Sequence, residues 1–349
     1  MTASRRRLGA ALPAMLIAAL IGGVAARADE LVAFSTAKAR ATALGGAYFS
    51  AEDDLFSALW NPASFGDPRY LQRREIGLYL MPATPAMAVR AYRTRDAAWN
   101  RDGRLTESEA ILSALSVVKG LSLGWRTWML GFVNVDEPLR PRPTSEPMLS
   151  GWNGTTGRSY TVALAFKLAP QVVLGGAAKR EVRADEAASL GHWGGSFGVL
   201  LRPSAKVNIG LTYVARPDEL IGLAEELERV DSGTINGGVS WYPWTGAAWL
   251  VDVRNLDNSE GRFGFAEVHV GMEQTFYHIV SFRGGWYRIR EDRTDVYSGG
   301  IGIKAPWLDP DPKRPGRRGD VVSYTFVRQH GVDWDRRWHM LALTIPLEW

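Results

Sequence analysis

The sequence predicts an all-β fold: a transmembrane antiparallel β-barrel of about 14 strands, with an N-terminal segment that plugs the lumen. Three observations support this prediction: an alternating strand at the C-terminal end, an export signal at the N-terminal end, and a series of alternating runs between them. This combination is typical of barrels in the bacterial outer membrane. The alternative is a barrel of 16 strands.

The C-terminal end is a strand with one apolar face, because successive side chains of a strand point to opposite sides. In an outer-membrane barrel such a face contacts lipid, and a terminal aromatic lies at the membrane interface. We expect the barrel assembly machinery to recognise this end through Leu343, Ile345, Leu347 and Trp349. The apolar face consists of Leu341, Leu343, Ile345, Leu347 and Trp349, and the other face of Met340, Ala342, Thr344, Pro346 and Glu348.

The N-terminal end has the composition of an export signal. Arg5, Arg6 and Arg7 precede an apolar stretch, and Ala26-Arg27-Ala28 offers a small-residue cleavage site. We predict a signal peptide over residues 1–28, cleaved near Ala28, and a location in the outer membrane of a Gram-negative bacterium. The alternative is an uncleaved membrane anchor. No later run approaches the ~20 apolar residues of a spanning helix.

From residue 158 onward the chain is a series of alternating runs, each about as long as the 9–11 residues of a tilted membrane strand. One run places Ile209, Leu211 and Tyr213 opposite Asn208 and Thr212. We count about 14 strands, which start near Ala86 if Arg73 to Met81 is excluded from the wall. The residues expected to face the lumen are Lys167, Arg180, Lys206, Asn208, Asn236, Asp252, Arg254, Glu267, His269 and Arg283.

The connections between these runs alternate between short and long, as periplasmic and external connections do in outer-membrane barrels. A soluble β-sandwich would have no such alternation. One long connection, 305–319, falls on the periplasmic side as an exception. The predicted periplasmic connections are 274–277, 243–246, 203–205, 169–171 and 126–127, and the predicted external ones are 330–337, 290–295, 255–261, 215–231, 183–190 and 136–157. An aromatic girdle is expected at the periplasmic strand ends from Trp125, Trp128, Trp241, Trp244, Trp307 and Trp349.

Two helices are expected outside the wall. Thr106-Glu107-Ser108-Glu109 forms a capping box before apolar residues at helical spacing, and 217–229 has a similar apolar stripe. Both suit packed surface helices. Alternatively, they form a lip that collects an apolar ligand.

Composition argues against several classes of function. Residues 1–28 hold four Arg and no acid, so removing them from the 41 basic and 37 acidic residues leaves 37 of each and a net charge of zero. A nucleic-acid partner would favour a basic face. The chain has no Cys, its five His lack the spacing of a metal site, and no catalytic or nucleotide-binding motif stands in a suitable context. We therefore expect no enzymatic activity, no catalytic residues, no cofactor, no metal and no nucleic-acid partner.

The segment before the barrel carries a motif instead of strand alternation. A Gly-Gly-Ala start at Gly45, Gly46 and Ala47 is followed by an acidic step and then by Asn-Pro-Ala. This pattern resembles the N-terminal signature of the long-chain fatty-acid transporter type of outer-membrane protein, a broad family that includes toluene-uptake porins and PorV-like proteins. Ser64 stands where Gly is usual. The matching residues are Gly45, Gly46, Ala47, Asp53, Asp54, Asn61, Pro62 and Ala63.

The resemblance implies that residues 29–71 form a plug inside a barrel of residues 72–349. Gly45 and Gly46 permit unusual backbone angles, while Pro62 fixes a kink next to Asn61. The alternative is a structural turn without a gating role. Asp53 and Asp54, with Glu52, would pair with lumen cations or cap a helix start. We predict a plug or gate motif at Gly45, Gly46, Asp53, Asp54, Asn61, Pro62 and Ala63, and an apolar ligand pocket lined by Phe49, Leu55, Phe56, Leu59 and Trp60.

Two functions follow from the resemblance. The first is a channel for passive uptake of hydrophobic small molecules, such as fatty acids or aromatic hydrocarbons, which leave sideways through the wall. The second is a PorV-like barrel that does not transport but acts as a scaffold or shuttle for exported proteins. Partners are then outer-membrane lipid, the barrel assembly machinery and, for a transporter, a hydrophobic small-molecule ligand.

Overall fold

The computed structural model describes residues 31–34, 39–51, 55–65, 75–80, 118–138, 155–183, 192–215, 233–257, 266–289, 293–304, 320–332 and 335–348. Several predicted features lie outside these residues. They are the signal peptide, the strand near Ala86, the two extra helices, Trp307, Trp349, and the acidic step at Asp53 and Asp54.

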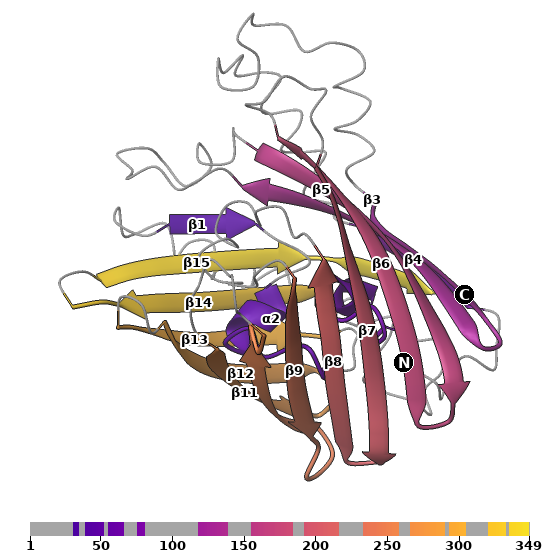
Figure 1. The fold of residues 1–349 in the computed structure, drawn as a ribbon. Helices are drawn as coiled ribbons and strands as arrows, with labels where there is room; N and C mark the ends of the chain where they lie inside the picture. Colours follow the sequence, from indigo (N-terminus) through magenta and orange to yellow (C-terminus); the bar gives the residue numbers. More distant parts are fainter. Residues whose placement is uncertain are drawn as a thin grey trace, which may run out of the picture.

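The described strands form one sheet, in which successive strands from β2 to β15 pair with each other (Figure 1). The sheet has sixteen strands; without β1, which pairs in parallel, and β16, which continues β15, fourteen antiparallel strands remain. The prediction of an all-β fold with about 14 antiparallel strands is therefore confirmed. The bounds are β2 Glu75–Leu80, β3 Val118–Trp125, β4 Trp128–Pro138, β5 Thr155–Ala169, β6 Val172–Arg183, β7 His192–Ser204, β8 Val207–Ala215, β9 Thr234–Trp241, β10 Ala247–Arg254, β11 Glu267–Phe276, β12 Val280–Ile289, β13 Thr294–Ile303, β14 Val322–His330 and β15 Asp335–Leu343.

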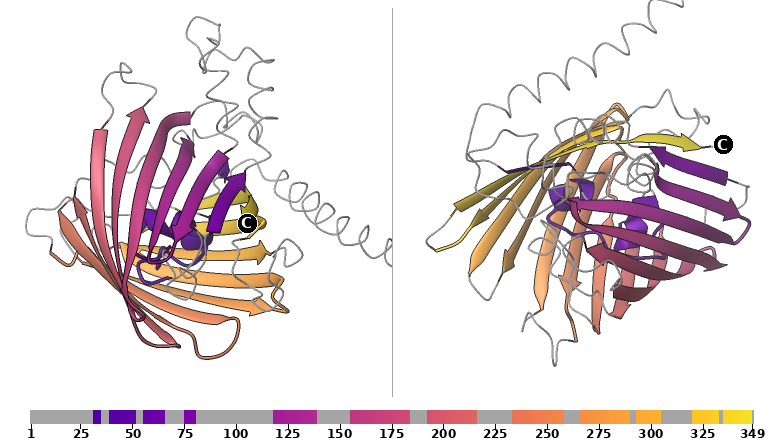
Figure 2. Two further views of the ribbon diagram at one scale, coloured as in Figure 1. Left: turned by 90° about the vertical axis from the view of Figure 1, so that its right-hand side faces the viewer. Right: turned by 90° about the horizontal axis from the view of Figure 1, so that it is seen from above.

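The two edges of the sheet meet only at the C-terminal end. β15 pairs with β14, whereas β16 (Ile345–Glu348) pairs antiparallel with β2. The other edge of β15 is taken by β1 (Leu31–Phe34), which pairs with it in parallel through Trp338 to Leu341. The sheet is thus curved but not closed along its full length (Figure 2). Residues 75–80 belong to the wall, because β2 pairs with β3 and β16, so the condition under which the strand count started near Ala86 is not met.

The strand bounds confirm the alternation of connection lengths in part, because 290–293 and 331–334, on the side predicted to be long, are shorter than 242–246 on the other side. Short connections, such as 126–127 and 205–206, join strands at one end of the sheet, and the connections at the other end include 139–154 and 216–233. The long connection 304–321 lies at the short-connection end, as the sequence predicted. Which end faces the periplasm stays a prediction.

The two faces of the sheet have opposite chemistry. Large apolar side chains of the outer face are exposed, among them Leu164, Phe197 and Met272 at 50, 65 and 62 %. The inner face buries polar and charged side chains instead. Those that the sequence placed inward and the structure buries are Asn208, Asn236, Asp252, Arg254, Glu267, His269 and Arg283. Soluble domains show the reverse distribution.

Two residues predicted to face the lumen do not. Arg180 is exposed on the outer face, where its guanidinium lies 5.6 Å from the centre of the Trp193 ring. Lys206 is exposed in the connection between β7 and β8 and donates a hydrogen bond to the Pro243 carbonyl. For Lys206 the cause is alternation extended past a strand end, because a turn breaks the period of two. Arg180 lies within β6, and its outward position shows that the inward parity assigned to this strand was wrong.

Exposed aromatic residues gather at the short-connection end. Trp125 and Trp128 have ring centres 6.0 Å apart, and Trp249 lies between Trp241 at 5.2 Å and Trp244 at 6.4 Å. Trp249 also pairs in register with Trp241, which places it at the same level. The predicted girdle is present among the described residues, and Trp249 extends it. No helix of the described chain is long and apolar enough to cross a membrane.

Candidate functional site

An internal segment, residues 39–65, lies on the concave face of the sheet (Figures 1 and 2). It contains the short helix α2 (Ala39–Ala43) and the 3-10 helix η1 (Leu55–Leu59). Gly45 and Gly46 end α2 with φ angles of 65° and 75°, which a residue without a Cβ adopts at least strain. Nearly all described residues of the segment are buried.

The first half of the segment crosses the strands in reverse chain order. Thr325 of β14 donates a hydrogen bond to the Ala39 carbonyl at 2.7 Å, and Ser298 of β13 donates one to the Ala43 carbonyl at 3.1 Å. Ser50 then reaches β9, where its hydroxyl lies 2.7 Å from that of Ser240. Residues 39–50 thus brace the wall from β14 back toward β8.

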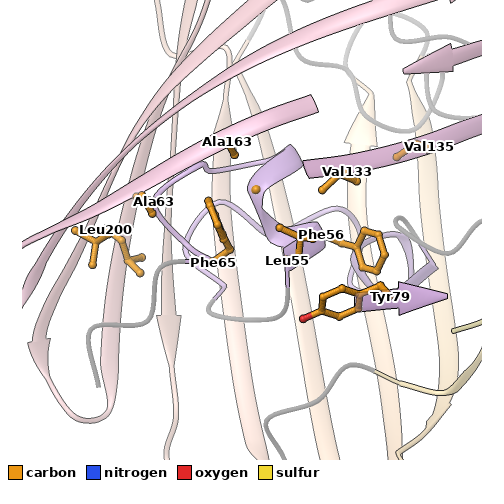
Figure 3. Packing of buried hydrophobic residues seen from close by; sticks show 12 residues of the cluster. Leu55, Phe56, Ala63, Phe65, Tyr79, Val133, Val135, Ala163 and Leu200 are labelled. Carbon is orange, nitrogen blue, oxygen red and sulfur yellow. The ribbon is translucent and has the colours of Figure 1, made fainter. Parts of the chain in front are cut away.

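The second half of the segment covers the early strands. Leu55, Phe56, Ala63 and Phe65 pack into one apolar cluster with β4 to β7 side chains such as Val133 (Figure 3). The ring of Phe56 meets that of Tyr79 in β2 edge-on, with centres 5.4 Å apart. Together, the two halves contact strands from β2 to β14.

A charged network holds α2 at the short-connection end. Arg40 binds both carboxylate oxygens of Glu273 in β11 at 2.9 Å. Glu273 also accepts a 2.5 Å hydrogen bond from Arg283 in β12, and Arg283 pairs with Asp320 at 2.5 Å. Ser323 donates to the same Asp320 oxygen. The network therefore connects the internal segment with the end of the long connection 304–321.

Asp320 lies outside the strands, and its charge is set by this network. Burial acts to raise the pKa of its carboxyl, but the charge and hydrogen bond of Arg283 and the charge of Lys304 together hold the pKa below its ordinary value. The carboxylate therefore remains ionised in the folded protein at neutral pH, which keeps the ion pair intact.

The bend after α2 is held by buried side chains of β10 and β11. His269 donates from Nδ1 to the Gly45 carbonyl at 2.6 Å, and Arg254 donates to the Gly46 carbonyl at 2.5 Å. Asp252 accepts hydrogen bonds from the backbone N–H groups of both Tyr48 and Phe49. Each of these wall side chains is buried with 0 % exposure. The inner charges therefore serve the backbone of the segment, which would otherwise lack partners.

Asn61 is the corresponding anchor of the second half. Its amide donates to the Phe49 carbonyl at 2.8 Å and to the Val199 carbonyl of β7 at 3.2 Å. Its side-chain oxygen accepts from the Ala63 N–H, which stabilises the turn around Pro62. Asn61 therefore ties the two halves of the segment to each other and to the wall.

Glycines of the wall allow the segment to approach the backbone of the sheet. A Cβ at Gly285 would overlap the backbone of Leu44 and Gly45, and one at Gly175 would overlap Pro62 and Ala63. Gly210 meets Phe49 in the same way. Any larger residue at these positions would displace the segment, so the inner face is shaped to its backbone.

The residues predicted to line an apolar pocket are already packed. Leu55 and Phe56 belong to one core cluster, Phe49 and Trp60 belong to another, and Leu59 contacts both. A cavity beside Trp60, Gly46 and Arg254 has a volume of about 10 Å³ for the centre of a water molecule, the space of about one water. A ligand pocket at the predicted residues stays a prediction, and it requires these contacts to separate.

Only part of this site was predicted from the sequence. It marked Gly45 and Gly46, which lie against β11 and β12, and Asn61, Pro62 and Ala63, which lie against β6 and β7. It missed Arg40 and Asp320, because neither lies in an alternating run or in the motif. Among the described residues, no group of three or more His, Asp or Glu is placed to hold a metal ion.

No protein-family model matches the chain, and no curated protein matches it. Among solved structures it is similar to the CymD monoaromatic hydrocarbon channel, with 12 % identity, a TM-score of 0.43, and coverage of 88 % of this chain and 94 % of that one. It is also similar to a triple mutant of the Rhodopseudomonas blastica porin, with 10 % identity, a TM-score of 0.35, and coverage of 66 % and 76 %. Likeness at these TM-scores adds no argument to the strand pairing.

Proposed function

We propose that this protein is an outer-membrane β-barrel channel whose lumen is plugged by the internal segment. The observation that carries the proposal is the inverted distribution of side chains: exposed apolar residues cover the outer face, while polar and charged residues are buried inside. An antiparallel sheet of this kind is stable where lipid, rather than water, contacts its outer face. The aromatic residues at the short-connection end fit a membrane interface.

For the cargo, we propose hydrophobic small molecules such as fatty acids or aromatic hydrocarbons. The support is the apolar character of Phe49, Leu55, Phe56, Leu59 and Trp60, which the internal segment brings into the lumen. In the packed state these side chains contact the wall and one another. Uptake therefore requires the segment to shift, because the packed interior offers them no free surface.

A non-transporting scaffold for exported proteins is the second candidate. It is favoured by how completely the segment is fixed, since glycine contacts and buried charges hold it from β14 to β6. A scaffold needs no path through its lumen, and tight packing stabilises it. The two candidates therefore differ in whether the segment must move.

A reversible tether tests this difference. The Ser50 and Ser240 hydroxyls are 2.7 Å apart, so Ser50→Cys/Ser240→Cys places two thiols in reach of a disulfide between segment and wall. The chain has no native Cys to interfere. If the protein is a channel that requires the segment to move, oxidation should abolish the uptake of a labelled fatty acid or of toluene into vesicles that contain the protein. Reduction should restore this uptake.

The matched control is a pair within the wall. The hydroxyls of Thr275 and Ser281, on β11 and β12, are 2.8 Å apart, so Thr275→Cys/Ser281→Cys forms a cross-link that leaves the segment untethered. Uptake through this variant should not depend on oxidation. If the wild-type protein inserts but transports neither compound, the transport proposal is wrong and the scaffold candidate replaces it.

A further inference from the structure

A cluster of arginines lies on the outer face of β12 to β15, at the end of the sheet where 290–293 and 331–334 connect the strands. Strand register places Trp286, Tyr297, Arg328 and Arg337 side by side in one row. The next row toward the connections holds Arg288, Asp295, His330 and Asp335. Both rows belong to the membrane-facing side of the proposed barrel.

Alternating burial establishes that these side chains point outward. Val296, Val327 and Gln329 are at most 2 % exposed, whereas the side chains of Arg288, Arg328 and Arg337 are 52, 45 and 44 % exposed. Below them on the same face lie apolar residues such as Phe282. The arginines therefore lie at the edge of the apolar surface nearest the connections 290–293 and 331–334. Arg328 and Arg337 are in the same row as the rings of Trp286 and Tyr297.

Two carboxylates position the three guanidinium groups without neutralising them. Arg328 donates from Nε to both oxygens of Asp335 at 2.9 and 3.2 Å, and Arg337 lies 3.6 Å from the same carboxylate. Arg288 lies 4.0 Å from Asp295. Among the described residues of the two rows, three guanidinium groups face two carboxylates, an excess of one positive charge.

We propose that this arginine cluster, Arg288, Arg328 and Arg337, binds the phosphate of an anionic lipid headgroup in the outer leaflet. Guanidinium groups match phosphate oxygens in geometry and charge, and Trp and Tyr belong at the headgroup level of a membrane. A lipid, rather than a free anion, is the expected source because the cluster adjoins an apolar surface that acyl chains would cover. This inference rests on the proposed membrane location.

The test uses the full chain folded in zwitterionic detergent, with lipid A carrying its phosphates as the probe and dephosphorylated lipid A as the comparison. We expect phosphorylated lipid A to bind about tenfold or more tightly than the dephosphorylated form, as charge-assisted hydrogen bonds to phosphate imply. Arg328→Gln/Arg337→Gln should abolish that difference, and Arg328→Lys/Arg337→Lys should retain part of it. Native mass spectrometry counts the bound lipid.

The matched control is Arg126→Gln/Lys206→Gln, which removes two exposed charges at the opposite end of the sheet and should leave binding unchanged. Equal binding of both lipid forms by the wild type, or unaltered binding by the double Gln variant, would overturn the inference. Competition by inorganic phosphate as effective as that by the lipid would overturn the lipid assignment. A chain that inserts into vesicles but fails these tests leaves the channel proposal standing, whereas failure to insert rejects both.

Discussion

At the scale of the residue, adjacent glycines of one strand face different surroundings. A Cβ at Gly285 would overlap the backbone of the internal segment, whereas the nearest atom to a Cβ at Gly284 is Met272 Cγ at 3.9 Å. We predict that Gly285→Ala lowers the free energy of unfolding by about 1–3 kcal/mol, and that it raises the leakage of small solutes by displacing the segment. Urea titration and liposome swelling measure the two effects.

Gly284→Ala is the control, because it makes the same change on the other face of the same strand. It should alter the free energy of unfolding by less than about 0.5 kcal/mol. Equal effects of the two substitutions would mean that backbone flexibility of β12, and not contact with the segment, explains the glycine at 285.

Asp320 gives the fold a dependence on pH. Its folded pKa lies below the ordinary value of 3.8, so its contribution to stability is fully present above that value and is lost as the pH falls through the folded pKa. We predict that acid lowers the unfolding midpoint of the wild type more than that of Asp320→Asn. Thermal midpoints at neutral pH and at about pH 3 measure the difference.

Asp335→Asn serves as the control for this measurement. Asp335 pairs with Arg328 on the exposed surface, where an ion pair contributes little to stability. Its removal should therefore leave the acid sensitivity almost intact. If Asp320→Asn and the wild type respond to acid alike, the buried network does not depend on that carboxylate.

At the residue scale, the sequence predicted the face to which a side chain points but not the group that it binds. Alternation predicted that Asp252, Arg254 and His269 face inward, because a strand alternates by geometry alone. It could not predict that these side chains bind the Tyr48, Gly46 and Gly45 backbone, since such pairings join residues about 200 positions apart. Arg40 and Asp320 gave no local signal at all.

At the scale of the element, β16 is the point where the two edges of the sheet meet. Its four residues pair with β2 from Ile345 opposite Leu80 to Glu348 opposite Gly77. We predict that deleting residues 345–349 leaves the β2 edge unpaired and lowers the fraction of folded protein in the membrane. Heat-modifiable gel mobility measures that fraction.

Trp349→Ser separates pairing from recognition, because it keeps the backbone of β16. A loss of folded protein equal to that of the deletion would assign the effect to the aromatic residue and to its recognition by the assembly machinery. Folding of the deletion variant at the wild-type level would show that β16 is dispensable.

Strands were easier to predict from sequence than the pieces at the sheet edges. Runs such as β11 are long enough to show their period, and the connections between them differ in length. β2 lies within the range 72–349 predicted for the barrel, but its single short run after a non-alternating segment did not identify it as a wall strand, and β1 is only four residues long. Both owe their strand conformation to pairing with β15, β16 or β3, which only the folded chain reveals.

At the scale of the whole molecule, the exposed apolar face predicts behaviour in solution. We predict that the folded protein is obtained in detergent or lipid with a β-type circular dichroism spectrum, and that heating shifts its gel mobility. Without amphiphile the exposed apolar residues should cause aggregation. A monodisperse, water-soluble product would contradict the membrane assignment.

The course of the internal segment also implies an order of events during folding. Residues 55–65 contact the strands that come early in the chain, whereas Ala39 and Arg40 contact β14 and β11, which come late. If the strands join the sheet in chain order, we predict that the segment docks from its C-terminal half to its N-terminal half. The partners of Ala39 and Arg40 arrive last. In a chain arrested before β11 joins the sheet, Leu55 and Asn61 would be packed against the early strands, while α2 would lack its partners in β11 and β14.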